Sequence, residues 1–169
     1  MEDRIRDLEA RLGALEDVEA IRRLKALYGE LVDSRFDDDG FLPAERVAPI
    51  ADQIADLFTE DAVWDGAALG VSRGRAEIRE RFVASTLTFS WHFFVKPQIE
   101  VRGDDATGRW DILSPCTMPG DRPFWMAGVE DDRYERVGGV WKHKSMKLRV
   151  VFMSPYERGW AKKAKGASE

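Results

Sequence analysis

The sequence YERVGGVWKHKSMKLRVVFM, residues 134–153, carries the features that decide the fold. The pair Gly138-Gly139, between two runs of alternating apolar and polar residues, is typical of a β-hairpin turn. After the turn, Trp141 marks one face of the strand, yet the apolar residues from Met146 onward lie on the other parity. Because side chains alternate along a strand, this change predicts a β-bulge near Ser145, which would curl the sheet.

Two more turn signals divide the second half of the chain. They are Gly103-Asp104-Asp105 and Pro119-Gly120-Asp121, and they recur at intervals typical of a sheet. Together with the hairpin they predict four antiparallel strands, over about residues 89–102, 106–117, 123–137 and 140–153.

The first half of the chain has the periodicity of helices. From Ile5 to Leu31, apolar residues recur at steps of three and four, which predicts one amphipathic helix, or two if Gly13 breaks it. We expect the stripe to pack on the sheet, and its first turns to pack there or against another subunit. Two shorter helices are predicted from about Pro43 to Phe58 and over residues 75–82, with a short strand between them.

Helices followed by a curved meander indicate an α+β fold. We expect a cone-shaped barrel, in which three N-terminal helices pack on a strongly curved, mostly antiparallel sheet and enclose an apolar cavity. The expected organisation is an N-terminal amphipathic helical extension over residues 1–14, the cone domain over residues 15–155 and a basic C-terminal tail over residues 156–169.

Composition narrows the class of protein. The length of 169 residues suits one domain, and 26 basic against 31 acidic residues give a net charge of −5, which argues against nucleic acid as a partner. The single cysteine, Cys116, excludes an internal disulfide. The charged N-terminus holds no apolar run, so we expect no signal peptide, no membrane span and a cytoplasmic protein.

One of the two histidines, His92, lies in the apolar stretch of residues 88–95. An imidazole moves protons near neutral pH, so a histidine walled by aromatic side chains is a candidate base in a pocket. A half-buried histidine that bonds a backbone carbonyl is the alternative. The other histidine, His143, shares a face with Trp141, and we interpret it as structural. With two histidines far apart and no clustered cysteines, we expect no metal site.

Five segments, taken in order, resemble the SnoaL-like branch of the nuclear transport factor 2-like superfamily. They are residues 56–66, residues 74–82, His92 with residues 99–101, residues 106–110 and residues 134–141. The resemblance spans roughly residues 15–150. It implies a cone-shaped α+β barrel that is commonly dimeric or trimeric and binds hydrophobic small molecules without a cofactor. The superfold hosts dehydratases, isomerases, hydrolases, cyclases and non-catalytic binders, so the fold alone does not name an activity.

Within this branch the pattern is nearest to the bile-acid 7α-dehydratases. That resemblance implies that Tyr28, Asp33 and His92 surround the substrate. Where those enzymes carry a fourth residue, an aspartate, this chain has Ser114, which cannot supply the negative charge that orients an imidazolium. Asp33 could supply it instead if it reaches His92, and by helical geometry we expect Asp33 to converge on the same cavity as Tyr28 only if the last turn of the helix unwinds.

The sequence therefore favours a cofactor-independent dehydratase or isomerase acting on a hydrophobic ring compound, such as a steroid, terpenoid or polyketide. His92 would be the general base, Tyr28 would bond the leaving hydroxyl or the enolate oxygen, and Asp33 would orient the base. We expect the substrate to be lined by Trp64, Phe94, Trp110, Ser114, Trp125 and Met146.

Alternatives remain open at this point. Tyr28 shares its stripe with apolar residues and could be a core tyrosine, and Asp33 could simply end the helix. The chain could also be a non-catalytic binding or assembly module, or the small subunit of a ring-hydroxylating dioxygenase. We expect no nucleic acid and no membrane as partners, and a homodimer or homotrimer.

Overall fold

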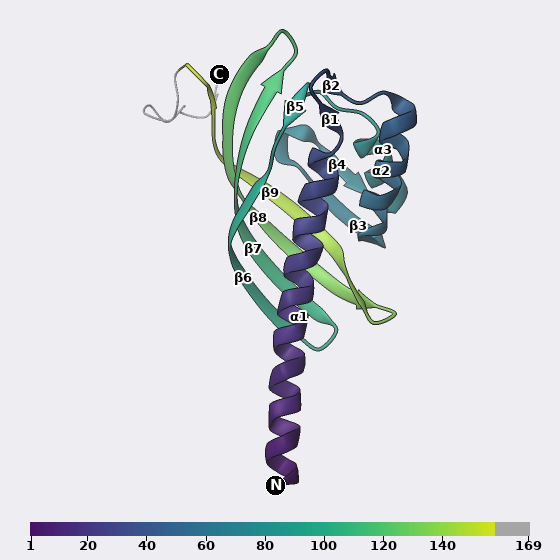
Figure 1. Ribbon diagram of the computed structural model, residues 1–169, viewed down its shortest axis with the longest axis vertical. Coiled ribbons are helices and arrows are strands. Elements are labelled where there is room, and N and C mark those ends of the chain that lie inside the picture. Colours follow the sequence, from purple (N-terminus) through teal and green to yellow (C-terminus); the bar gives the residue numbers. More distant parts are fainter. Residues whose placement is uncertain (158–169) are drawn as a thin grey trace.

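The computed structural model describes residues 1–157, in which three α-helices pack on a strongly curved sheet (Figure 1). The helices are α1 (Glu2–Asp33), α2 (Ala44–Asp56) and α3 (Gly74–Phe82), with a 3-10 turn η1 (Ala67–Leu69). The strands are β1 (Phe36–Asp37), β2 (Gly40–Phe41), β3 (Phe58–Asp65), β4 (Val71–Arg73), β5 (Phe89–Ser90), β6 (Phe93–Arg102), β7 (Asp105–Met118), β8 (Arg122–Val137) and β9 (Val140–Pro155).

The main sheet has the strand order β4-β3-β9-β8-β7-β5, and β6 pairs with β7 beside β5. All neighbours are antiparallel except β3 and β9, which run parallel. The sheet is therefore mixed, and it curves into a half-barrel with the helices on its concave side (Figure 1). The expected α+β architecture, three helices on a curved and mostly antiparallel sheet, is confirmed.

The predicted bulge is present. The register between β8 and β9 shifts between Arg133 and Tyr134, which leaves Lys144 as the extra residue, directly before Ser145. A second shift, which the sequence did not indicate, leaves Val151 unpaired farther along β9. Each extra residue bends the strand, so the longest strands wrap around the concave core.

Two predicted boundaries were wrong. The second helix ends at Asp56 rather than Phe58, because the backbone turns into the sheet there: the carbonyl oxygen of Leu57 accepts the N–H of His143 at 2.8 Å. The predicted strand over residues 89–102 is two strands, β5 and β6, and His92 lies in the break between them.

The long helix α1 runs unbroken through Gly13. Its buried residues begin only at Ile21, and its first turns extend beyond the sheet (Figure 1). The apolar stripe therefore packs on the sheet only in the second half of the helix. Most of the predicted basic tail, residues 158–169, lies outside the described residues. None of the helices in residues 1–157 combines the length and the apolar composition that a membrane crossing requires.

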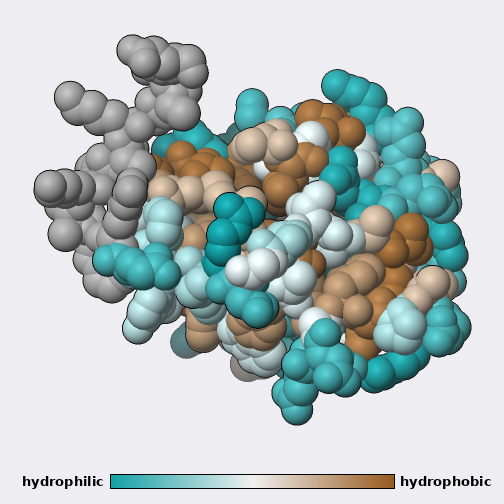
Figure 2. All heavy atoms as spheres, turned by 90° about the horizontal axis from the view of Figure 1, so that it is seen from above, coloured by the Kyte–Doolittle hydropathy of each residue, from teal (hydrophilic) through white to brown (hydrophobic). Residues whose placement is uncertain are grey.

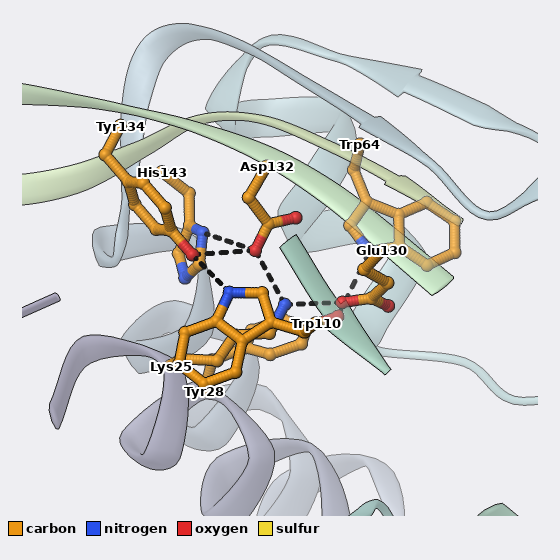
Figure 3. A network of polar contacts seen from close by, with 8 residues as sticks. All are labelled: Lys25, Tyr28, Trp64, Trp110, Glu130, Asp132, Tyr134 and His143. Atoms are coloured by element: carbon orange, nitrogen blue, oxygen red, sulfur yellow. Dashed lines mark hydrogen bonds and ion pairs between the residues drawn. The ribbon is translucent and has the colours of Figure 1, made fainter. Parts of the chain in front are cut away.

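A buried ion-pair cluster fixes α1 against the sheet (Figure 3). Lys25 is fully buried, and its ammonium group binds Glu130 and, at 2.8 Å, Asp132, both on β8. Burial lowers the pKa of Lys25, but the charges of Asp132 and Glu130 outweigh it and raise this pKa. Tyr134 donates a hydrogen bond of 2.8 Å to Asp132, and Trp110 donates one of 2.9 Å to Tyr134. The cluster therefore joins α1 to β7 and β8.

His143 lies behind this cluster and is fully buried (Figure 3). Among the described residues neither ring nitrogen has a hydrogen-bond partner, and Nδ1 is 4.0 Å from Asp132. The ring packs between Phe58 and Tyr134, with centroids 5.0 Å away on either side. Burial, followed by the charge of Lys25, lowers the pKa of His143 well below its ordinary value, so the ring is neutral. The structural interpretation of His143 fits this setting.

We expect Lys25→Met to lower the free energy of unfolding by about 3–5 kcal/mol, because it leaves two buried carboxylates without their cation. Urea denaturation would measure the loss. The matched control is Arg22→Met on the exposed side of the same helix, which should change stability by no more than about 0.5 kcal/mol. Equal effects of the two substitutions would contradict the assigned role of the cluster.

His143→Leu should change how stability depends on pH. The pKa of His143 is lowered in the folded state, so below about pH 6.5 the unfolded chain binds more protons and wild-type stability falls. This one group contributes a slope of at most about 1.4 kcal/mol per pH unit, and the leucine variant lacks it. Urea titrations between pH 5 and 7.5 would show that the free energy of unfolding of the variant rises relative to that of the wild type as pH falls. Parallel curves would show that His143 does not titrate as assigned.

Candidate functional site

A cavity of about 690 Å³ lies between α1, α3 and the concave face of the sheet. By area its wall is mostly apolar, although polar and charged side chains from different elements also line it. The buried part of this wall comprises Tyr28, Val32, Arg35, Trp64, Ser72, Phe82, Ser90, Ile112, Glu130 and Leu148. His92 also lines the cavity, so the predicted base opens onto a binding space.

Asp33 holds His92 through both of its carboxylate oxygens. Oδ1 lies 2.5 Å from Nδ1 of the ring, and Oδ2 accepts the backbone N–H of His92 at 2.9 Å. The bond to Oδ2 satisfies the backbone N–H of His92 in the break between β5 and β6, where strand pairing is interrupted. The break and the carboxylate together therefore fix the position of the imidazole.

These contacts also select a tautomer of His92. An ionised carboxylate only accepts hydrogen bonds, so Nδ1 carries the hydrogen and the lone pair is on Nε2. Among the described residues Nε2 has no hydrogen-bond partner. The ring stacks on Phe94, with centroids 5.9 Å apart and planes 12° from parallel. Its side chain is 18% exposed and that of Asp33 is 7% exposed, so the carboxylate lies behind the ring rather than in the open cavity.

Asp33 reaches the histidine without any unwinding of the helix, and it is not among the residues that line the cavity beside Tyr28. Asp33 is the last residue of α1, and Ser34 still bonds the carbonyl oxygen of Glu30 at 2.9 Å in the regular helical manner. The chain containing His92 comes to the helix instead, because the strand breaks at that residue.

Tyr28 lies on the cavity wall from α1, and its hydroxyl accepts a hydrogen bond of 3.1 Å from Nε1 of Trp64 (Figure 3). Burial, followed by the charge of Glu130, raises the pKa of Tyr28 well above its ordinary value. The hydroxyl therefore keeps its hydrogen and can donate it to a ligand. Trp64 lies against Gly66, where a Cβ atom would come within 2.2 Å of the indole, so any other residue there would displace the ring.

Two buried charged residues of the cavity wall were missed by the sequence analysis. Arg35 is buried; its side chain donates to the carbonyl oxygens of Val32 and Phe82 at 3.0 and 3.2 Å, and burial lowers its pKa to about 10. Glu130 reaches the wall from β8 while bound to Lys25. A basic residue just after a helix and an acidic residue in an alternating strand are common in any sequence, so neither carried a distinguishing signal.

Of the six residues predicted to line the substrate, the structure brings Trp64 to the cavity. Within the described residues the other five are not on its wall. Trp110 and Met146 are on the concave face, but they are buried deeper in the core, whereas Phe94 is partly buried beneath α1 and packs against the core. Trp125 neighbours Met126, a cavity residue, on a regular part of β8, so alternation directs it to the convex face.

Ser114, which replaces the aspartate of the bile-acid dehydratase pattern, is fully buried on β7. Its hydroxyl is 3.2 Å from the sulfur of Cys116. Because Asp33 already binds Nδ1 of His92, the imidazole has a carboxylate partner without this position. Within the described residues no three histidine, cysteine, aspartate or glutamate side chains gather as a set of metal ligands.

Comparison with solved structures shows the same fold in several proteins. A hexachlorocyclohexane dehydrochlorinase, LinA type 2, superposes with a TM-score of 0.70 at 22% identity over 86% of this chain and 92% of its own. A protein from Novosphingobium aromaticivorans named for scytalone dehydratase has a TM-score of 0.69 at 21% identity, over 84% and 89%. A nuclear transport factor 2-like protein from the same organism has a TM-score of 0.66 at 25% identity, over 85% and 88%.

No curated protein matches the sequence. A family model described as the SnoaL-like domain matches residues 50–147, from the middle of α2 to the middle of β9. This segment contributes His92, Trp64 and Glu130 to the cavity, while Tyr28 and Asp33 precede it on α1. Since the match covers more than half of the sequence and the fold is that of nuclear transport factor 2-like proteins, the chain belongs to the SnoaL-like domain family.

Proposed function

We propose that this protein is a cofactor-independent enzyme of the dehydratase or isomerase type, with His92 as its general base. One observation carries the proposal: Asp33 occupies Nδ1 of a histidine that lines a largely apolar cavity, which leaves Nε2 as a free proton acceptor. A carboxylate in this place also stabilises the imidazolium formed when the base takes a proton.

The reaction begins when Nε2 of His92 removes a proton from a carbon next to a carbonyl or conjugated system. The electron pair of the broken C–H bond moves into the conjugated system, and Tyr28 donates a hydrogen bond to the oxygen that gains charge. In a dehydration the imidazolium returns the proton to the leaving hydroxyl, which departs as water. In an isomerisation the proton returns to a different carbon. General-base help of this kind supplies about 10² to 10⁴ in rate.

Arg35 supports the same chemistry from the cavity wall. Its guanidinium is buried among Val32 and Phe82, where an electrostatic interaction is stronger than in water. A positive charge there stabilises an enolate oxygen formed in the cavity. We therefore add Arg35 to Tyr28 as a candidate for binding the developing oxyanion.

A hydrophobic ring compound of steroid, terpenoid or polyketide size is the proposed substrate class. The cavity volume of about 690 Å³ lies within the range of about 300–1,000 Å³ typical of small-molecule sites. Apolar side chains of the wall, such as Trp64, Ile112 and Leu148, suit a ring system. The end of the molecule opposite the N-terminus carries hydrophobic patches between hydrophilic side chains, a surface that hydrophobic molecules can approach (Figure 2).

The comparisons support elimination chemistry. One structural neighbour is a dehydrochlorinase and another is named for a dehydratase, and both words denote eliminations. The positions of Tyr28, Asp33 and His92 also follow the bile-acid 7α-dehydratase pattern, which favours a hydroxylated ring as the substrate. A non-catalytic binding module of the same fold is the alternative, and turnover measurements separate the two.

His92→Ala should lower kcat by at least about 10²-fold on a hydroxy-enone ring compound that the wild type converts, because the base is lost. Asp33→Asn should also lower kcat, since an amide neither carries the charge nor fixes the tautomer. Tyr28→Phe should lower kcat by a smaller factor. Candidate compounds would first be found by thermal shift, and turnover followed by absorbance of the conjugated product.

The matched control for Asp33→Asn is Asp38→Asn, the same substitution in an exposed turn, which should leave kcat unchanged. Equal melting temperatures would show that the variants fold. Turnover that persists in His92→Ala would overturn the mechanism. Compounds that bind without being converted by the wild type would favour the binding module instead.

A further inference from the structure

The projecting part of α1 carries an apolar stripe that the rest of the described chain does not cover (Figure 1). Ile5, Leu8, Leu12 and Leu15 are 50%, 52%, 56% and 68% exposed. Their spacing of three, four and three residues is the a and d pattern of a coiled coil, with Ile5 and Leu12 at a and the other two at d. We call these four residues the seam.

The seam faces away from the body of the protein. From Leu15 the apolar residues continue in steps of three, through Val18 and Ile21 to Leu24. Each step of three falls about 60° short of a full helical turn, so the stripe moves about 180° around the helix over these three steps. The first firm contact with the body comes from Asp17, which accepts bonds of 2.7 and 3.0 Å from β8 and β9. Asp17 is at position f, opposite a and d, so a second helix can lie along the seam without meeting the body.

The charges beside the seam are arranged for a parallel partner of the same sequence. The e positions hold Glu2, Glu9 and Glu16, and the g positions hold Arg4 and Arg11. In a parallel pair each g residue meets the e residue five positions later on the partner, which gives Arg4–Glu9 and Arg11–Glu16 contacts, each twice by symmetry. In an antiparallel pair e meets e and g meets g, which would oppose like charges.

These charged side chains are also available for ion pairs with a partner helix. Among the described residues Arg4, Glu9 and Glu16 form no ion pair, and Arg11 pairs with Asp7 of its own helix at 3.8 Å. The seam ends at Leu15, because the next a and d positions are the charged and exposed residues Glu19 and Arg22.

We propose that the N-terminal segment of α1 pairs with the same segment of a second copy of this chain, as a short parallel two-stranded coiled coil. Isoleucine at a with leucine at d, as at Ile5 and Leu8, suits two strands, whereas isoleucine at d would favour more. Because the bodies lie on the outer sides of the pair, each cavity stays on its own subunit. The inference does not depend on the proposed activity.

Sedimentation velocity of the full chain over a concentration series tests the pairing. Two heptads are short, so the wild type should dissociate on dilution. Leu8→Glu with Leu15→Glu should weaken the dimer at least about 100-fold, because charges enter the seam. The matched control is Ala10→Glu with Ala14→Glu, which adds the same charges to exposed positions outside the seam and should leave the dimer intact.

Charge exchange tests the orientation. Glu9→Arg with Glu16→Arg sets arginine against arginine at four contacts of the parallel pair and should weaken the dimer at least about tenfold. Adding Arg4→Glu and Arg11→Glu restores opposite charges and should restore the dimer. In an antiparallel pair this fourfold variant would still oppose like charges.

A wild type that stays monomeric, a trimer, or a dimer that the seam variants leave intact would each overturn the proposal. A dimer that the fourfold variant fails to restore would overturn the parallel orientation. The seam residues are exposed in the monomer, so thermal unfolding at a dilution where the wild type is monomeric should be the same in every variant and shows that each one folds.

Discussion

The buried ion pairs of Lys25 with Glu130 and Asp132 are the constraint on which the rest of the structure depends. A helix lying in the hollow of a curved sheet could slide or roll, because apolar contacts have little directionality. A buried ammonium group that must reach two carboxylates on one strand permits one depth and one rotation. Tyr28 and Asp33 follow three and eight residues later on the same helix. The ion pairs of Lys25 therefore also fix the positions of these two residues.

The site itself depends on an irregularity of the sheet. A continuous strand would have paired the backbone N–H of His92 with its neighbour and turned the ring according to strand parity. At the break that N–H donates to Asp33 instead, and the same carboxylate also binds the imidazole ring. One acidic side chain thus replaces a strand contact and selects the tautomer of the ring.

The sequence predicted which face of the sheet a side chain lies on better than how deeply it is buried. Alternation along the strands correctly placed Trp110 and Met146 on the concave side, but not how far each lies from the cavity, because depth is set by where α1 sits. The position of α1 is in turn set by contacts between Lys25 and residues more than one hundred positions away, for which a sequence has no local signal. The bulge near Ser145 could be predicted because a change of parity is local. The break at His92 could not, because a distant carboxylate holds it.

The apolar stripe of α1 has two halves on opposite sides of one uninterrupted helix. An ideal helix turns by about 100° per residue, so the angle between the halves is fixed by the number of residues between Leu15 and Ile21 rather than by their identities. One residue inserted or deleted there would leave both stripes intact and yet turn one against the other by about 100°. In this segment, evolution should therefore tolerate many substitutions but few changes of length.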